Sequence, residues 1–327
     1  MSGCSFGRWL GLVAVLLALA GPARAATNAG PTVVLVLGAP GEPEFGTNLV
    51  EQATLWSGAL DTAGARKLEL GRTDGGTNDL AEFRQILAAE PTNGVVPLWI
   101  VLIGHGTFDG KEARFNLRGP DLSATEFAAL LKPFSRPVAV INTTAASAPF
   151  LKPLAGTNRV VITATRSGYE TSFARFGLEF ARSIASPVAD LDQDGQTSLL
   201  ESFLHASAQV LDSYRTQTRL MTEHALIDDN GDGLGTPADW FRGLRAVKKA
   251  DGKQSLDGLR AHQWHLVRSE AENRLTPEQR TKRDALELAV AAWRDRKPSM
   301  PETEYFHHLE TLLRELAEIY RSAPAPQ

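Results

Sequence analysis

The sequence predicts an α/β fold, in which a mostly parallel sheet has helices on both faces and is followed by Asp-rich loops and a C-terminal helical hairpin. Short apolar runs rich in β-branched residues are typical of parallel strands buried on both faces. Segments of helical periodicity separate these runs, which implies right-handed crossovers. From about Asp257 the sequence becomes charged and helical. The predicted strands are Thr32–Leu37, Leu98–Ile103, Val138–Ile141 and Arg159–Ala164.

The first predicted helix covers about Asn48–Ala63, because four apolar residues recur on one of its faces: Leu49, Ala53, Trp56 and Leu60. Lys67–Leu70 is expected to be a further strand. Asn78 or Asp79 caps the next helix.

Ser123 and Glu126 form the pattern of a capping box, which predicts that another helix begins there. Further helices are expected near Pro149–Leu154 and over Ser172–Ile184 and Leu199–Tyr214.

Three helical segments are expected in the tail: Asp257–Asn273, Pro277–Arg296 and Glu302–Arg321. An apolar stripe on the last one predicts a hairpin packed on itself or on the α/β domain, with a partner-binding coiled coil as the alternative. The stripe comprises Leu309, Leu312, Leu313, Leu316 and Ile319.

Residues 1–25 have the features of a secretory signal, with Arg8 before an apolar core and an A-x-A pattern that ends at Ala25. The core is too short to span a membrane, and no later stretch is sufficiently apolar. We therefore expect an exported protein, periplasmic or extracellular, without a membrane span after signal cleavage. Cys4 is removed with the signal, so the mature chain has no thiol nucleophile and no disulfide.

Acidic residues exceed basic ones in the mature chain. Removing Arg8 and Arg24 from the 34 basic residues leaves 32 against 38 acidic ones, a net charge of −6. A nucleic-acid-binding protein would show a basic patch instead, so no nucleic-acid partner is expected. The expected domains after the signal are an α/β domain at 26–186, an acidic-loop region at 187–241 and a helical tail at 242–322.

The first acidic loop, Asp190–Glu201, has the spacing of an EF-hand calcium loop. Alternate residues of such a loop direct oxygens at one centre, with glycine at the sharp turn, and a carboxylate returns from the next helix. Counting from Asp190, the eighth position of the loop is Thr197, where paired EF-hands have an aliphatic residue that joins two loops. We therefore expect an unpaired loop-helix site with a structural role. The alternative is a capped Asp/Gly-rich turn without an ion. The candidate calcium ligands are Asp190, Asp192, Asp194, Gln196, Ser198 and Glu201.

The second acidic loop, Asp228–Asp239, follows the same spacing less closely, because Gly235 and Pro237 depart from the pattern and its last acid is the shorter aspartate. Calcium is again the expected ion. The candidate ligands are Asp228, Asn230, Asp232 and Asp239.

Polar residues follow two of the predicted strands, Gly104-His105-Gly106 on one and Asn142-Thr143-Thr144 on the next. Open α/β sheets place their sites at these carboxyl ends. The order of strands, the GHG sequence and the later ITATRSGYETSFARF segment together resemble the caspase/legumain superfamily of cysteine peptidases, over about Thr32–Ile184.

The resemblance implies that His105 occupies the position of the catalytic histidine and Gly106 that of the oxyanion donor. Thr144 falls at the position of the cysteine, and a shifted alignment would place Ala145 or Ser147 there. A hydroxyl has a far higher pKa than a thiol, and a two-residue dyad activates it poorly. The expectation is thus an inactive pseudopeptidase or a binding scaffold with a protein or peptide partner. The alternatives are a hydrolase that uses Thr144 or Ser147 with His105, and an unrelated calcium-dependent interaction module.

Overall fold

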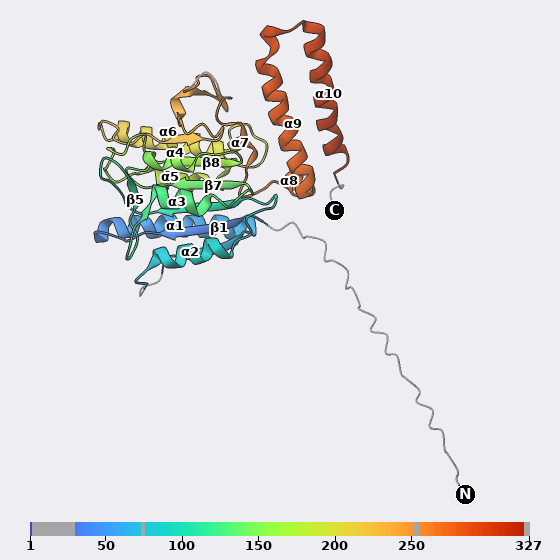
Figure 1. The fold of residues 1–327 in the computed structure, drawn as a ribbon. Coiled ribbons are helices and arrows are strands. Elements are labelled where there is room, and N and C mark those ends of the chain that lie inside the picture. The colour runs from blue at the N-terminus through green and yellow to red at the C-terminus, as the bar shows by residue number, and fades with distance from the viewer. Residues whose placement is uncertain (2–29, 73–75, 251–254, 324–327) are drawn as a thin grey trace.

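The computed structural model describes residues 1, 30–72, 76–250 and 255–323, and it confirms the predicted α/β class (Figure 1). Apart from Met1, the predicted signal peptide lies outside the described residues. Within the described ranges, no helix combines the length and the apolar character that crossing a membrane requires.

The main sheet has the strand order β10-β9-β8-β7-β3-β1-β2. The five strands β8, β7, β3, β1 and β2 pair in parallel. Strand β9 pairs antiparallel with β8, and β10 pairs antiparallel with β9. Its members are β1 (Thr32–Leu37), β2 (Arg66–Leu70), β3 (Leu98–Ile103), β7 (Val138–Asn142), β8 (Arg159–Thr163), β9 (Leu226–Asp228) and β10 (Thr236–Pro237).

Two small antiparallel sheets, which the sequence did not predict, accompany it: β4 (Gly106–Phe108), β5 (Ala113–Phe115) and β6 (Leu122–Ser123) in one, and β11 (Phe241–Arg242) and β12 (Arg245–Ala246) in the other.

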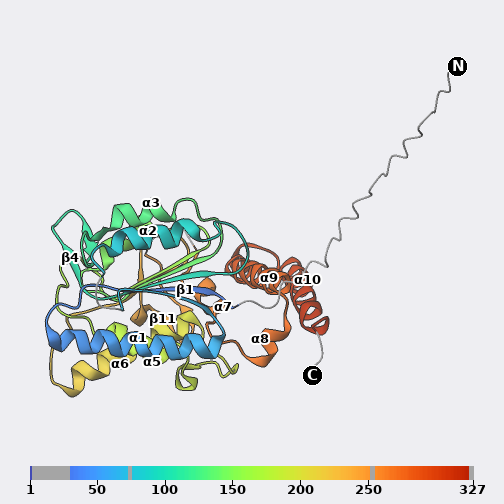
Figure 2. The same cartoon turned by 90° about the horizontal axis from the view of Figure 1, so that it is seen from below.

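Helices cover both faces of the main sheet (Figure 2). On one face lie α1 (Pro43–Ala63), α5 (Phe176–Ser183) and α6 (Leu199–Thr216). On the other lie α2 (Asp79–Ala89), α3 (Ala124–Leu131) and α4 (Leu151–Leu154). Successive residues of β3 alternate between the two cores, with Trp99 in the first and Leu98 in the second. This explains why the strands are apolar throughout.

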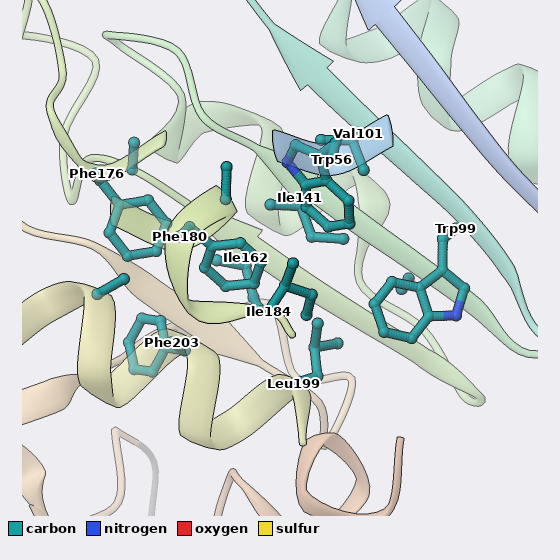
Figure 3. Packing of buried hydrophobic residues seen from close by; sticks show 14 of the residues in the cluster. Trp56, Trp99, Val101, Ile141, Ile162, Phe176, Phe180, Ile184, Leu199 and Phe203 are labelled. Atoms are coloured by element: carbon teal, nitrogen blue, oxygen red, sulfur yellow. The ribbon is translucent and has the colours of Figure 1, made fainter. Parts of the chain in front are cut away.

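The first core is rich in aromatic side chains (Figure 3). Trp56 of α1 stacks on Phe180 of α5, with ring centroids 6.0 Å apart. Phe176 and Phe203 extend this packing to α6. All four side chains are buried, so this core joins three helices that are distant in the sequence.

The tail contains α7 (Leu259–Gln263), α8 (Glu270–Arg274), α9 (Pro277–Asp295) and α10 (Glu302–Arg321). The last two form the predicted hairpin (Figure 1), in which the Trp293 indole N–H donates to the Tyr305 carbonyl over 3.0 Å. The prediction of a continuous segment over Asp257–Asn273 is wrong. The chain between α7 and α8 is extended because Leu199 N–H donates to the Trp264 carbonyl.

The stripe on α10 is only partly covered. Leu312 and Ile319 are buried, whereas Leu313 remains 43% exposed and lies beside the exposed Phe306.

We expect Trp56→Ala to lower the free energy of unfolding by about 3–5 kcal/mol, because it removes the ring that joins α1 to α5. Denaturant unfolding measures this loss. Val50→Ala on the exposed side of the same helix is the control, with an expected loss of below ~0.5 kcal/mol. Equal losses in both variants would contradict the packing described here.

Candidate functional site

His105 lies immediately after β3, at the carboxyl edge of the sheet. Its Nε2 atom is 3.2 Å from the Pro40 carbonyl oxygen. Phe45 packs edge-on against the imidazole, with centroids 5.5 Å apart, and Phe173 lies 6.0 Å away. Phe45 and Phe173 stack on each other with centroids 4.8 Å apart, so the imidazole packs against one aromatic pair, with Nε2 beside a carbonyl acceptor.

Gly106 brings the backbone of this loop close to the end of β7. A Cβ atom at Gly106 would lie 2.6 Å from Thr144 Oγ1, so a side chain does not fit there. The structure thus places His105, Gly106 and Thr144 at one corner, where the adjacent strands β3 and β7 end.

The Thr144 hydroxyl is directed at its own strand rather than at His105. It is fully buried and donates to Asn142 Oδ1 over 2.7 Å, and the Thr144 backbone N–H donates to the same oxygen over 3.1 Å. Ser147 is also fully buried, and its hydroxyl contacts Thr165 Oγ1 at 3.2 Å. Within the described part of the chain, no hydrogen bond joins His105 to either hydroxyl.

The first acidic loop brings three carboxylates together. One oxygen each of Asp190, Asp192 and Asp194 lie within 4.8 Å of one another. Asp190 accepts the backbone N–H groups of Asp194 and Gly195, which curls the loop around it. Burial and the neighbouring aspartates raise the pKa of Asp194 above its usual value. This cluster could hold a metal ion.

Other predicted ligands in this loop have protein partners. Ser198 and Glu201 form a capping box at the start of α6. The second Glu201 oxygen accepts N–H groups from Leu191 and Asp192 over 2.8 and 3.3 Å. The Gln196 amide oxygen accepts from Ser269 N–H.

His262 also lies at the first loop, where its Nε2 is 3.0 Å from Asp192 Oδ2. The sequence did not predict this contact. Their separation of 70 residues leaves no local pattern that would reveal the contact.

The second acidic loop curls in a similar way. Asp228 accepts N–H groups from Gly231 and Gly233, each over 2.8 Å. Asn230 and Asp232 each accept the N–H two residues further on. Burial raises the pKa of Asp228 to about 6. Asp239, by contrast, has an exposed side chain.

Asp257 supplies the buried carboxylate of this second loop, a residue that the sequence analysis did not select. Its Oδ1 accepts N–H groups from Asp229 and Asn230, and its Oδ2 accepts the Thr236 hydroxyl. These are loop positions two, three and nine, the same positions from which Glu201 accepts in the first loop. Burial, together with the charge of Asp229, raises the pKa of Asp257 to about 8.

A separate cavity of about 880 Å³ lies between α6 and the residues around β9. Its wall is largely apolar and includes Phe176, Leu204 and Met221, with Glu223 and His224 as polar members. None of His105, Gly106, Thr144 and Ser147 lines it.

Comparison with known proteins gives structural likenesses alone. No protein-family model and no curated protein sequence matches the chain. The chain is similar to the Drosophila initiator caspase Dronc, with 11% identity and a TM-score of 0.43 over 71% of this chain and 96% of that one. It is also similar to caspase-1 from Spodoptera frugiperda, with 10% identity and a TM-score of 0.40 over 62% and 87% of the two chains. A protein from Geobacter sulfurreducens has 13% identity and a TM-score of 0.37 over 55% and 89%.

Proposed function

We propose that this chain is an exported, calcium-binding protein of the caspase/legumain type that is catalytically inactive and acts as a binding scaffold. The observation that carries the proposal is the state of the Thr144 hydroxyl, which is fully buried and donates to Asn142. A nucleophile must instead share its proton with a base and be open to the substrate.

The environment of His105 supports the same conclusion. Its Nε2–H donates to the Pro40 carbonyl, which leaves the lone pair of the ring on Nδ1, and no hydrogen bond in the described chain joins this ring to Thr144 or Ser147. A general base needs a free lone pair within reach of the nucleophile. With no thiol in the mature chain, the remaining hydrolase would use Thr144 or Ser147, and both of these hydroxyls are fully buried.

Calcium binding is supported most directly by the first loop. The oxygens of Asp190, Asp192 and Asp194 lie as close together as ligands of one ion, and a hard divalent cation would offset their mutual repulsion. In the second loop, the side chains of Asp228, Asn230 and Asp232 likewise accept backbone N–H groups of their own loop. Asp257 is the buried carboxylate of this loop. A bound ion in either loop would stiffen its connection to the tail, since His262 and Asp257 belong to the tail.

The scaffold has a surface suited to a protein or peptide partner. Phe306 and Leu313 lie exposed on one side of α10, and Leu309 lies between them in a shallow groove. Exposed apolar groups gathered on one helix face are typical of interaction sites.

We expect the purified mature protein, with calcium present, to cleave no member of a mixed peptide library. Mass spectrometry of the library after incubation measures this. His105→Ala, Thr144→Val and Ser147→Ala samples are run in parallel. Cleavage by the wild type that disappears in the His105→Ala sample would overturn the proposal and make the protein a hydrolase.

The Thr144 hydroxyl is expected to stabilise the fold rather than react. Thr144→Val should lower the free energy of unfolding by about 1–2 kcal/mol, because Asn142 Oδ1 loses a buried donor. Thr47→Val, at an exposed site on α1, is the control and should change it by less than ~0.5 kcal/mol. An unchanged stability of Thr144→Val would show that the hydroxyl is available for another role.

Calcium at ~5 mM is expected to raise the Tm by about 3 °C relative to a chelated sample. Asp192→Asn should weaken calcium binding at least about tenfold, since it removes one of three clustered charges. Its carboxylate has His262 as its side-chain partner, so the loop should keep its shape. Glu302→Gln, an exposed acid on α10, is the matched control. Isothermal titration that detects no calcium binding to the wild type would contradict this part of the proposal.

A further inference from the structure

A second cavity, of about 330 Å³, lies at the opposite edge of the sheet from His105. Residues just before β1, β3, β7 and β8 form part of its wall: Pro31, Pro97, Pro137 and Asn158. Trp99 of β3, the segment from Arg260 to Glu272 and the first half of α9 also contribute to the wall. In Figure 1 the hairpin stands beside the end of the sheet where β1 begins. The cavity lining includes neither His105 nor any carboxylate of the first loop.

Four arginines line this cavity: Arg260, Arg268, Arg280 and Arg283. Two acids, Glu272 and Asp284, also line it, and both are bound to Arg283 over 2.5 and 2.7 Å. In the described part of the chain, neither acid forms an ion pair with Arg260 or Arg268. His265 adds no charge, because burial lowers its pKa to about 3.

Of these four arginines, Arg268 has the fewest polar partners for its positive charge. Among the described residues, its guanidinium has no hydrogen-bond or ion-pair partner. Burial, together with the charges of Arg280 and Arg283, lowers the pKa of Arg268 below its ordinary value. A guanidinium in such surroundings favours an oxyanion such as a carboxylate or a phosphate, two oxygens of which it can bind in a bidentate manner.

Two further N–H donors at this cavity are buried without an acceptor in the described chain. They are Nε1 of Trp99, whose side chain is 1% exposed, and Nε of Arg260. Leaving a buried donor unsatisfied is unfavourable, so folded proteins rarely do it without a ligand or water. The other side of the Arg260 guanidinium is fixed, because its Nη1 donates to Asn158 over 3.1 Å.

We propose that this cavity binds a small ligand through an oxyanion group, a phosphate or a carboxylate. Arg268 and Arg260 supply the charge, and Trp99 supplies a neutral N–H donor. The volume of about 330 Å³ lies at the lower end of small-molecule sites, so it leaves room for an organic part beside the anion. None of the residues assigned above to catalysis or to calcium lines the cavity, so this site is independent of the function proposed above.

The test is titration of the mature protein with inorganic phosphate and, separately, with acetate, each at a constant ionic strength set with sodium chloride. Isothermal titration calorimetry gives the Kd, and tryptophan fluorescence provides a local readout because Trp99 and Trp264 line the cavity. We expect saturable binding of one anion per chain. The anion that binds more tightly identifies the oxyanion group.

Arg268→Gln should weaken this binding at least about tenfold, and Arg260→Gln provides a second test of the same site. Arg314→Gln is the matched control, because Arg314 is exposed on α10 and far from the cavity lining. Circular dichroism and the Tm establish that each variant is folded. Absence of saturable binding of both anions to the wild type, or an equal Kd in the Arg268→Gln and Arg314→Gln variants, would overturn the proposal.

Discussion

The pairing of β1, β3, β7 and β8 between two apolar layers is the constraint on which the rest of the structure depends. Every residue of these four strands is buried except Arg159, the first residue of β8. Strands buried on both faces carry mainly apolar side chains. Polar chemistry is thereby confined to the two edges of the sheet. The carboxyl edge carries His105 and Thr144, and the amino edge carries the arginine-lined cavity. Both candidate sites are consequences of the same buried sheet.

In each of the two acidic loops, one buried carboxylate accepts hydrogen bonds from the loop backbone. Glu201 does this in the first loop and Asp257 in the second, and each accepts from loop positions two, three and nine. Asp229 completes the second arrangement by accepting N–H groups at the start of α7. The loops therefore join the sheet to the tail, so an ion bound there would stiffen this connection.

At the corner around His105, the side chains are engaged by neighbours other than one another. Thr144 completes the turn after β7 by binding Asn142, and His105 packs against the stacked pair of Phe45 and Phe173. A hydroxyl in this position contributes more to stability than to reactivity, because its proton already has a buried acceptor. The two surfaces proposed for binding, the exposed face of α10 and the cavity at the amino edge, both lie outside this corner.

Features that depend on neighbours along the chain could be predicted from the amino-acid sequence. The buried strands follow from apolar runs, and the caps at Asn78 and Ser123 follow from polar residues placed just before helical periodicity begins. Only the tertiary structure decided that Asp257 provides the carboxylate of the second loop, that His262 reaches Asp192 and that four arginines surround one cavity. These contacts join residues tens of positions apart, and no local periodicity or spacing records which distant side chains folding will bring together.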